Sequence, residues 1–160
     1  MLNQPAPDFT VVTLGAEGPE TFTLSKHIGE KNIVLLFVPM AFTSVCTEQM
    51  CSTGEDMSSF SDLDADVYCI SGDGPFAQQA WAEKEGISVK MLSDYEHSVA
   101  KDYGVAYDQF LPEANLIMGG VAKRSAFVID KQGFVRHVDI KDHPKDVPCA
   151  DEIKKALAAL

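Results

Sequence analysis

Four cysteines are the most reactive side chains of this 160-residue chain, and Cys46 occupies the position best suited to chemistry. It follows a continuous apolar run, Asn32–Val38, and a loop that begins with Pro39, and it stands where a helix is expected to start. A helix N-terminus carries unpaired N–H groups and a partial positive charge, which stabilise a thiolate relative to a thiol. Because the thiolate is the nucleophilic form, Cys46 is a candidate nucleophile. A buried, inert cysteine is the alternative that position alone leaves open.

The residues before Cys46 form a recognisable pattern, Pro-x-x-x-Thr-x-x-Cys, in the segment Pro39-Met-Ala-Phe-Thr43-Ser-Val-Cys46. This pattern resembles the active-site signature of the peroxiredoxins, the alkyl hydroperoxide reductase and thiol-specific antioxidant family. In such a site Pro39, rigid and without an N–H, walls the pocket, and the backbone N–H groups of Val45 and Cys46 hold the peroxide oxygens. The Thr43 hydroxyl is expected to accept a hydrogen bond from the peroxide while donating toward the sulfur. Taken singly, Pro39 could end a strand and Thr43 could cap a helix.

The resemblance covers most of the chain and is strongest to the small single-domain bacterial peroxiredoxins. It implies that Arg124, just before the apolar run Ala126–Asp130, is the second active-site residue, whose permanent charge holds Cys46 as thiolate. One departure concerns Gln49, because many family members carry Glu three residues after the catalytic cysteine. The other matching segments are Pro5–Phe9, Ser71–Trp81, Leu92–Asp94 and Asp102–Val105.

A peroxidatic cysteine becomes a sulfenic acid and must be returned to thiol, so a resolving thiol is needed. Cys51 follows Cys46 at Cys-x4-Cys spacing, as in the bacterioferritin-comigratory type of peroxiredoxin. In an intact helix their Cα atoms would lie roughly 8.7 Å apart. A disulfide needs about 4.4–6.8 Å, so this pair requires the helix to unwind. Cys149 is the alternative resolver, Cys69 is interpreted as a core residue, and reduction by an external thiol alone stays open.

Alternating strands and helices predict a single α/β domain spanning residues 1–160. The expected fold is thioredoxin-like: an N-terminal hairpin and a central mixed sheet with helices on both faces. The predicted strands are Asp8–Thr13, Glu20–Leu24, Asn32–Val38, Asp66–Ser71, Val89–Leu92, Ser125–Ile129 and Phe134–Ile140. The predicted helices are Ser44–Leu63 with an interruption near Gly54, Pro75–Glu85 capped by Gly86, and Ala150–Leu160. Residues Ser93–Tyr103 are expected to lead into a further helix, which Gly104 ends.

Composition excludes several classes of partner. The formal net charge is −11, with 24 acidic and 13 basic side chains, so nucleic acid and anionic membrane surfaces are not expected partners. No apolar stretch reaches the ~20 residues of a membrane span, and the first residues do not resemble a signal peptide. These features and the cysteine usage predict a cytoplasmic protein. The four histidines show no metal-ligand spacing, so neither a metal nor a cofactor is expected.

The resemblance implies a thiol-dependent peroxidase that reduces hydrogen peroxide and organic hydroperoxides. It also implies a homodimer that is recycled by an external thiol reductant such as thioredoxin or glutaredoxin. Two other classes remain as alternatives. A thioredoxin-type dithiol–disulfide oxidoreductase would normally need Cys-x-x-Cys, which the chain lacks, and a non-enzymatic redox sensor could use the same thiolate. A Cys–His hydrolase is weaker, because no histidine is paired with Cys46 by the sequence.

Overall fold

The apolar run around Val34 forms strand β3, Asn32–Phe37, and all six of its side chains are buried. A strand buried on both faces belongs in the middle of a covered sheet, and β3 lies there. The structure, a computed structural model, describes residues 1–160. The other strands are β1 Thr10–Gly15, β2 Gly18–Thr23, β4 Ala65–Ser71, β5 Lys90–Ser93, β6 Ser125–Ile129 and β7 Val135–Ile140.

The seven strands form one mixed sheet in the order β2-β1-β5-β4-β3-β6-β7. Strands β3, β4 and β5 are parallel neighbours, whereas β6 and β7 form an antiparallel hairpin beside β3. The β1–β2 hairpin adds antiparallel strands at the other edge. The predicted combination of a parallel centre with antiparallel edges is confirmed.

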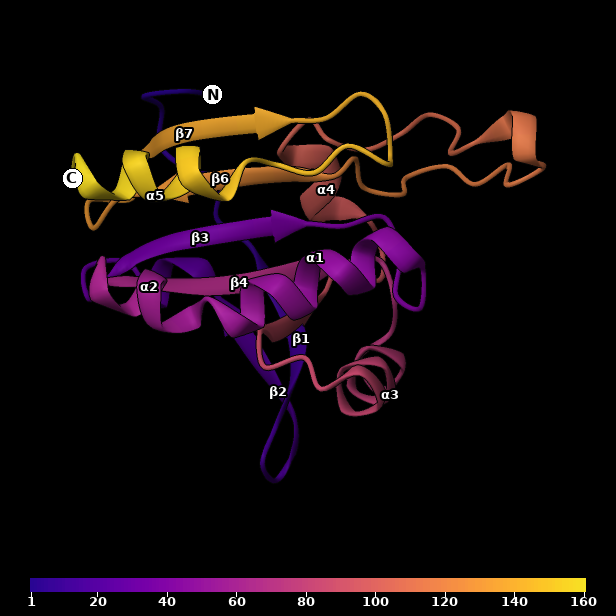
Figure 1. Cartoon of the computed structure of the whole chain (residues 1–160), viewed down its shortest axis with the longest axis horizontal. Coiled ribbons are helices and arrows are strands. Elements are labelled where there is room, and N and C mark those ends of the chain that lie inside the picture. Colours follow the sequence, from indigo (N-terminus) through magenta and orange to yellow (C-terminus); the bar gives the residue numbers. More distant parts are fainter.

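Helices cover both faces of the sheet, as predicted (Figure 1). On one face, residues of α1, α2, α3 and α5 pack into a core with Cys46 and Met50. On the other face, α4 packs with β1, β2 and a group of aromatic side chains that includes Phe37 and Tyr103. The helices are α1 Ser44–Glu55, α2 Met57–Asp62, α3 Pro75–Glu85, α4 Ser98–Asp102 and α5 Ala150–Ala158, with 3-10 turns at Leu24–Lys26 and Pro112–Ala114.

The interruption predicted near Gly54 in the helix over Ser44–Leu63 is confirmed, and it lies at Asp56. Gly54 lies inside α1, where an added Cβ would come within 2.9 Å of the Ser88 hydroxyl. This glycine therefore permits a close approach and does not end the helix. Asp56 ends α1 and forms an ion pair with Lys154 of α5, which ties the break to the neighbouring helix.

The structure also defines the bounds of two other predicted elements, a helix and the N-terminal hairpin. The helix expected within Ser93–Tyr103 spans Ser98–Asp102, and it starts there because the Asp94 carboxylate accepts the N–H groups of Val99 and Ala100 in its first turn. The N-terminal hairpin has a tighter turn than expected, since its strands are paired as far as Gly15 and Gly18.

No helix or strand is predicted for residues 106–123, which extend from the body of the protein as two paired segments, the legs of a region here called the arm (Figure 1). Its legs are joined by isolated bridges between Ala106 and Ala122 and between Phe110 and Met118. The 3-10 turn at Pro112–Ala114 forms the end of the arm. The base of the arm leads directly into Arg124 and β6, so the arm lies beside the candidate site.

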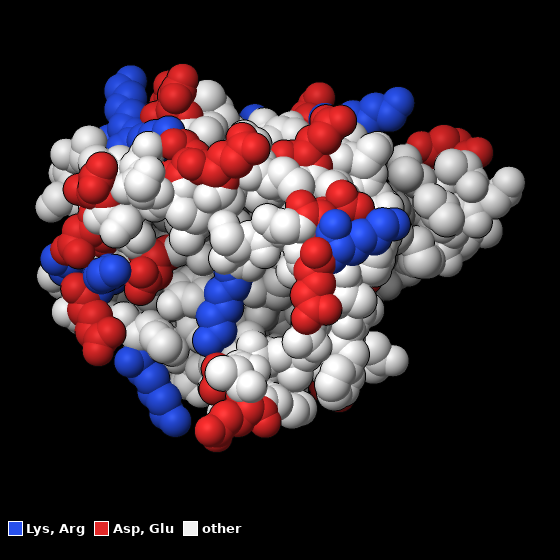
Figure 2. Space-filling view, turned by 60° about the horizontal axis from the view of Figure 1, so that its bottom comes forward, with Lys and Arg blue, Asp and Glu red and all other residues white.

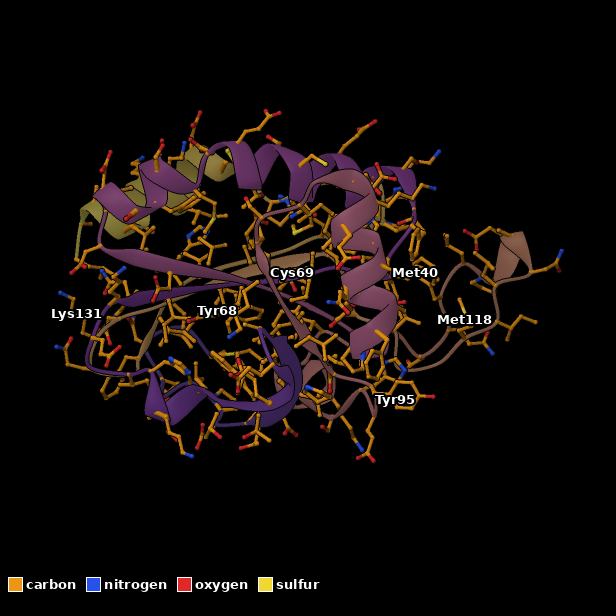
Figure 3. All side chains as sticks on the ribbon, turned by 90° about the horizontal axis from the view of Figure 1, so that it is seen from below. Met40, Tyr68, Cys69, Tyr95, Met118 and Lys131 are labelled. Atoms are coloured by element: carbon orange, nitrogen blue, oxygen red, sulfur yellow. The ribbon has the colours of Figure 1, made fainter.

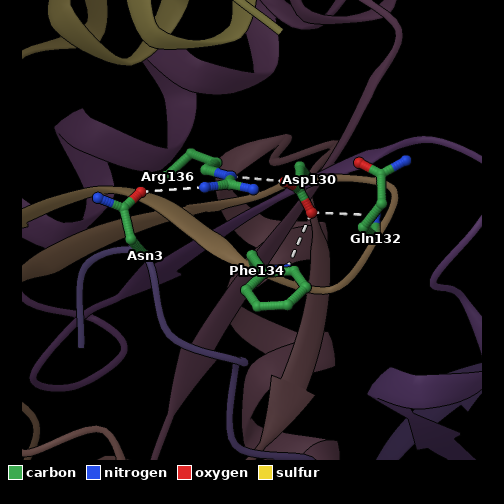
Figure 4. A network of polar contacts seen from close by, with 5 residues as sticks. All are labelled: Asn3, Asp130, Gln132, Phe134 and Arg136. Carbon is green, nitrogen blue, oxygen red and sulfur yellow. Dashed lines mark hydrogen bonds and ion pairs between the residues drawn. The ribbon is translucent and has the colours of Figure 1, made fainter.

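The β6–β7 turn is fixed by Asp130, as Figure 4 shows. One carboxylate oxygen accepts the N–H groups of Gln132 and Phe134, both at 2.9 Å, and the other accepts from Arg136 at 2.6 Å. Arg136 also donates to Asn3, which holds the N-terminus against this turn. Burial alone would raise the pKa of Asp130, but the hydrogen bonds outweigh it and lower the pKa.

Acidic side chains are spread over the face shown in Figure 2, with single basic side chains between them. This distribution agrees with the net charge of −11. None of the helices combines the length and the hydropathy of a membrane-spanning segment.

Candidate active site

Cys46 lies in the first turn of α1, at the end of the loop that follows β3. The helix begins after Thr43, whose backbone is extended, so Cys46 is the third helical residue. At this position a side chain lies among the unpaired N–H groups of the helix start. The sulfur is fully buried, and water is therefore kept away from a thiolate formed here.

Arg124 reaches the same point from the start of β6. Its Nη2 donates toward the Cys46 sulfur at 3.2 Å, and its Nη1 donates to the Gln49 side-chain oxygen at 2.8 Å. Its Nε and Nη2 also donate to the carbonyl of Pro144, at 3.1 and 3.0 Å. Arg124 as a whole is 2% exposed, so its charge acts on the sulfur with little screening by water. The amide of Gln49 thus keeps the contact with Arg124 without adding a negative charge.

A pocket of about 380 Å³ lies against Arg124, between the Pro39 loop and the arm. Of the residues that the sequence singled out, Pro39, Thr43 and Arg124 lie in its wall, whereas Cys46 and Cys51 do not. Its remaining lining comes from the loop, the start of α1, the arm and the segment after β7: Met40, Ser44, Val45, Phe110, Leu111, Glu113, Ala114, Leu116, His143, Pro144 and Lys145. In the view from below, Met40 lies beside α3 and Met118 lies on the arm (Figure 3).

The hydroxyl of Thr43 differs in part from the prediction. It donates to the Met40 carbonyl at 3.0 Å rather than toward the sulfur, because the loop turns that carbonyl toward it. It also makes no helix-capping hydrogen bond. With its proton committed to Met40, the oxygen has lone pairs free to accept a hydrogen bond from a substrate in the pocket.

The other three cysteines occupy distinct environments, and all are free thiols. Cys69 is fully buried in β4 (Figure 3), where burial and the nearby Cys46 and Asp73 raise its pKa well above the ordinary value. Cys69 therefore stays a thiol, as expected of a core residue. Cys51 lies within α1, partly exposed, and its sulfur contacts the Glu85 carbonyl at 3.5 Å. Cys149 is exposed and directly precedes α5.

Sequence reasoning missed two groups that hold the site together. The carbonyl of Pro144 anchors Arg124, and nothing in the local sequence signals that contact. The second group is Trp81, whose indole N–H donates to the Thr47 hydroxyl at 3.0 Å. A fully buried tryptophan usually finds a partner for its N–H, and that is the signal that could have found this bond. No group of three His, Cys, Asp or Glu side chains converges as a metal site would require.

The sequence model of the AhpC/TSA family matches residues 2–138. The chain belongs to this family. Alkyl hydroperoxide reductase E of Mycobacterium tuberculosis is 32% identical over 157 residues, which cover 97% of this chain and 94% of that protein. The thioredoxin peroxidase of Trypanosoma brucei rhodesiense is 34% identical over 151 residues, 89% of this chain and 71% of that protein. The reduced 2-Cys peroxiredoxin of Plasmodium vivax superposes with a TM-score of 0.84 at 25% identity, covering 99% of this chain and 80% of the other.

This member of the AhpC/TSA family is therefore a thiol-dependent peroxidase with the thioredoxin fold. Membership confirms the enzyme class expected from the Pro39–Cys46 pattern, and it replaces the dithiol oxidoreductase and hydrolase alternatives. It does not assign a role to any single residue.

Proposed function

We propose that the protein reduces hydroperoxides through Cys46, and the observation that carries the proposal is the 3.2 Å contact between Arg124 and the buried sulfur. The thiolate attacks the terminal peroxide oxygen, the O–O bond breaks, and the sulfur becomes a sulfenic acid. The departing oxygen takes a proton and leaves as water or an alcohol. Arg124 stabilises the negative charge of the thiolate and of the transition state from a fixed position.

The apolar side chains in the pocket wall support a substrate range that includes organic hydroperoxides as well as hydrogen peroxide. The pocket wall includes Met40, Phe110, Leu111 and Leu116, whose apolar side chains can contact an alkyl group. The arm supplies three of these four residues, so the arm separates small substrates from larger ones in this proposal. Pro39 is part of the pocket wall, where its rigid ring would shield the thiolate from bulk water in this proposal.

Thr43→Val is expected to slow peroxide reduction by about tenfold to a hundredfold without unfolding the protein. Valine has nearly the shape of threonine but offers no oxygen to the substrate, so the loss resembles the removal of one transition-state hydrogen bond. Stopped-flow measurement of peroxide loss gives the rate constant. Thr43→Ser is the matched control, because it keeps the hydroxyl and should retain most of the rate. Equal losses in both variants would remove the hydroxyl from the mechanism.

We further propose that Cys51 resolves the sulfenic acid. The Cys51 thiol attacks the sulfenic sulfur, a disulfide forms, and water leaves. Both cysteines lie on the continuous helix α1, so their Cα atoms are separated by roughly 8.7 Å for ideal helical geometry, too far for a disulfide. The first turns of α1 must therefore unwind before the bond forms. Amide exchange should increase across residues 43–54 on oxidation and hardly elsewhere.

Cys51→Ser is expected to keep the first reaction with peroxide at near the wild-type rate but to become prone to irreversible over-oxidation. The sulfenic acid would wait longer for rescue, and a second peroxide would convert it to sulfinic acid. Intact mass measured at rising peroxide concentration counts the added oxygens. Cys149→Ser is the matched control. If Cys149→Ser over-oxidises and Cys51→Ser does not, the exposed cysteine is the resolver.

A turnover assay with a dithiol reductant tests the function as a whole. A peroxidase consumes many equivalents of peroxide per protein at a steady rate, whereas a redox sensor would consume about one and stop. The dithiol also stands in for the external reductant, which we propose to be a protein of the thioredoxin or glutaredoxin type. One equivalent consumed in the presence of excess dithiol would contradict the proposal.

We also propose a homodimer in the cytoplasm, as the sequence resemblance implies. The four free thiols support a reducing compartment. Light scattering of the reduced protein should give twice the mass of the chain, and the mass of one chain would overturn the dimer.

A further inference from the structure

The loop between β3 and α1 has a strained backbone at Phe42. Its φ is +63°, in the left-handed region that a bulky side chain rarely adopts, and its side chain is 53% exposed. A conformation of this kind costs free energy and persists only where the surrounding structure holds it in place. The residues on both sides of Phe42 must therefore be fixed by other contacts.

Asp73, which follows β4, holds the residue before Phe42. The N–H of Ala41 donates to Asp73 Oδ2 at 2.7 Å, and the Ser71 hydroxyl donates to the same oxygen at 2.8 Å. Ser71 is positioned in turn by the side chain of Gln78 on α3, which donates to its hydroxyl at 2.9 Å. Ser71 and Gln78 are buried, so this carboxylate is fixed by the rigid frame of β4 and α3.

Thr43, the residue after Phe42, is held through Thr47 by a side chain of the same helix, α3. The Thr47 hydroxyl donates to the Thr43 carbonyl at 2.8 Å and accepts from Trp81 of α3 at 3.0 Å. Thr47 lies in the first turns of α1, so this contact is lost when those turns unwind. Asp73 lies outside the segment that unwinds. Its hydrogen bond to Ala41 is charge-assisted and thus among the stronger ones holding the loop.

We propose that Asp73 is a positioning residue that keeps residues 39–43 in the peroxide-reactive shape and so limits how often α1 unwinds. The inference rests on the proposed function, in which Cys46 reacts in the folded state and meets Cys51 in the unwound state. Loss of Asp73 releases the strain at Phe42 and favours the unwound state. The sulfenic acid then forms more slowly, but it condenses with Cys51 faster and meets a second peroxide less often.

The test compares Asp73→Ala with Asp73→Asn, which keeps an oxygen for Ala41 but removes the charge. Rapid-mixing kinetics give the rates of sulfenic acid and disulfide formation, and mass spectrometry gives the peroxide concentration that over-oxidises half of Cys46. We expect Asp73→Ala to slow the first step and to speed the second by about tenfold each. The peroxide concentration for half over-oxidation should rise at least as much, with Asp73→Asn in between.

Two controls separate positioning from general stability. Asp66→Ala also replaces an aspartate with alanine, but on β4, where Asp66 forms an exposed ion pair with Lys31. It should leave the rates of sulfenic acid and disulfide formation unchanged. Ile129→Val removes a buried methyl group of β6 and lowers the melting temperature, but it should not change the balance between disulfide and sulfinic acid. If Ile129→Val changes the balance as Asp73→Ala does, the positioning role is overturned.

The remaining outcomes are also decisive. Equal slowing of both steps by Asp73→Ala, or no change in the over-oxidation threshold, would overturn the proposal. If the wild-type protein forms no disulfide between Cys46 and Cys51, the resolving role of Cys51 fails separately. In that case the first step, measured in the Cys51→Ser background, decides about Asp73: tenfold slowing by Asp73→Ala supports positioning, and an unchanged rate overturns it. If Asp73→Ala does not fold, Asp73→Asn provides the same comparisons with smaller changes.

Discussion

Replacing Cys46 with serine is expected to abolish peroxide consumption while the fold stays intact. The hydroxyl of serine is not ionised at neutral pH, so the variant loses the nucleophile itself. The rate should fall by a factor on the order of 10⁴ or more, as when other nucleophilic residues are removed. The serine oxygen can still accept from Arg124, so the buried charge keeps a partner and the melting temperature should change little. Stopped-flow measurement of peroxide loss and thermal unfolding check the two parts.

Cys149→Ser is the matched control for this variant, because it makes the same change at an exposed cysteine. It should keep the rate of the first peroxide reaction. A Cys46→Ser protein that consumes peroxide at near the wild-type rate would show that another thiol is the nucleophile.

Arg124→Ala is expected to give the second largest effect, a slowing of peroxide reduction on the order of 10³-fold. The variant loses the only guanidinium that contacts the sulfur, so the thiolate and the transition state both lose their fixed positive charge. Less thiolate should be present at neutral pH, which its ultraviolet absorbance measures independently of turnover. The change also leaves the Pro144 carbonyl and the Gln49 side chain without their donor, so a lower melting temperature is expected.

Arg124→Lys separates charge from geometry in this prediction. Lysine keeps the positive charge but lacks the planar fork that reaches the sulfur, Gln49 and Pro144 together. Its rate should lie between those of the wild type and Arg124→Ala. If Arg124→Ala retains the full thiolate absorbance, the helix start alone stabilises the thiolate, and Arg124 acts only on the transition state.

Helices and strands could be predicted from the sequence where a local signal determines their bounds. Helix α3 has the predicted bounds, because Pro75 starts it and Gly86 ends it in the left-handed conformation, with φ of +68°. Strand β3 was predicted from an apolar run that has no other stable place than a covered sheet. Pro39 and Thr43 lie in the loop between β3 and α1, and Cys46 lies in the first turn of α1, so their proximity also follows from the local sequence.

Other features depend on contacts between distant segments, which periodicity does not report. The arm at residues 106–123 is held by bridges between its legs, and neither leg has a strand pattern of its own. Arg124 was placed by resemblance rather than by pattern, and its anchor at Pro144 lies beyond the β6–β7 hairpin. The break at Asp56 and the late start of α4 depend on single side-chain contacts that composition does not reveal.

The most direct test of the account treats the reduced protein with one equivalent of peroxide and measures the intact mass with and without thiol alkylation. Peptide mapping then locates the oxidised sulfur. The account predicts loss of two hydrogens from the chain, two thiols blocked to alkylation, and a peptide pair that joins Cys46 to Cys51. In the Cys51→Ser variant the same treatment should leave one added oxygen on Cys46, trapped as a sulfenic acid. Oxidation found first at Cys51, Cys69 or Cys149, with Cys46 still alkylated, would contradict the account.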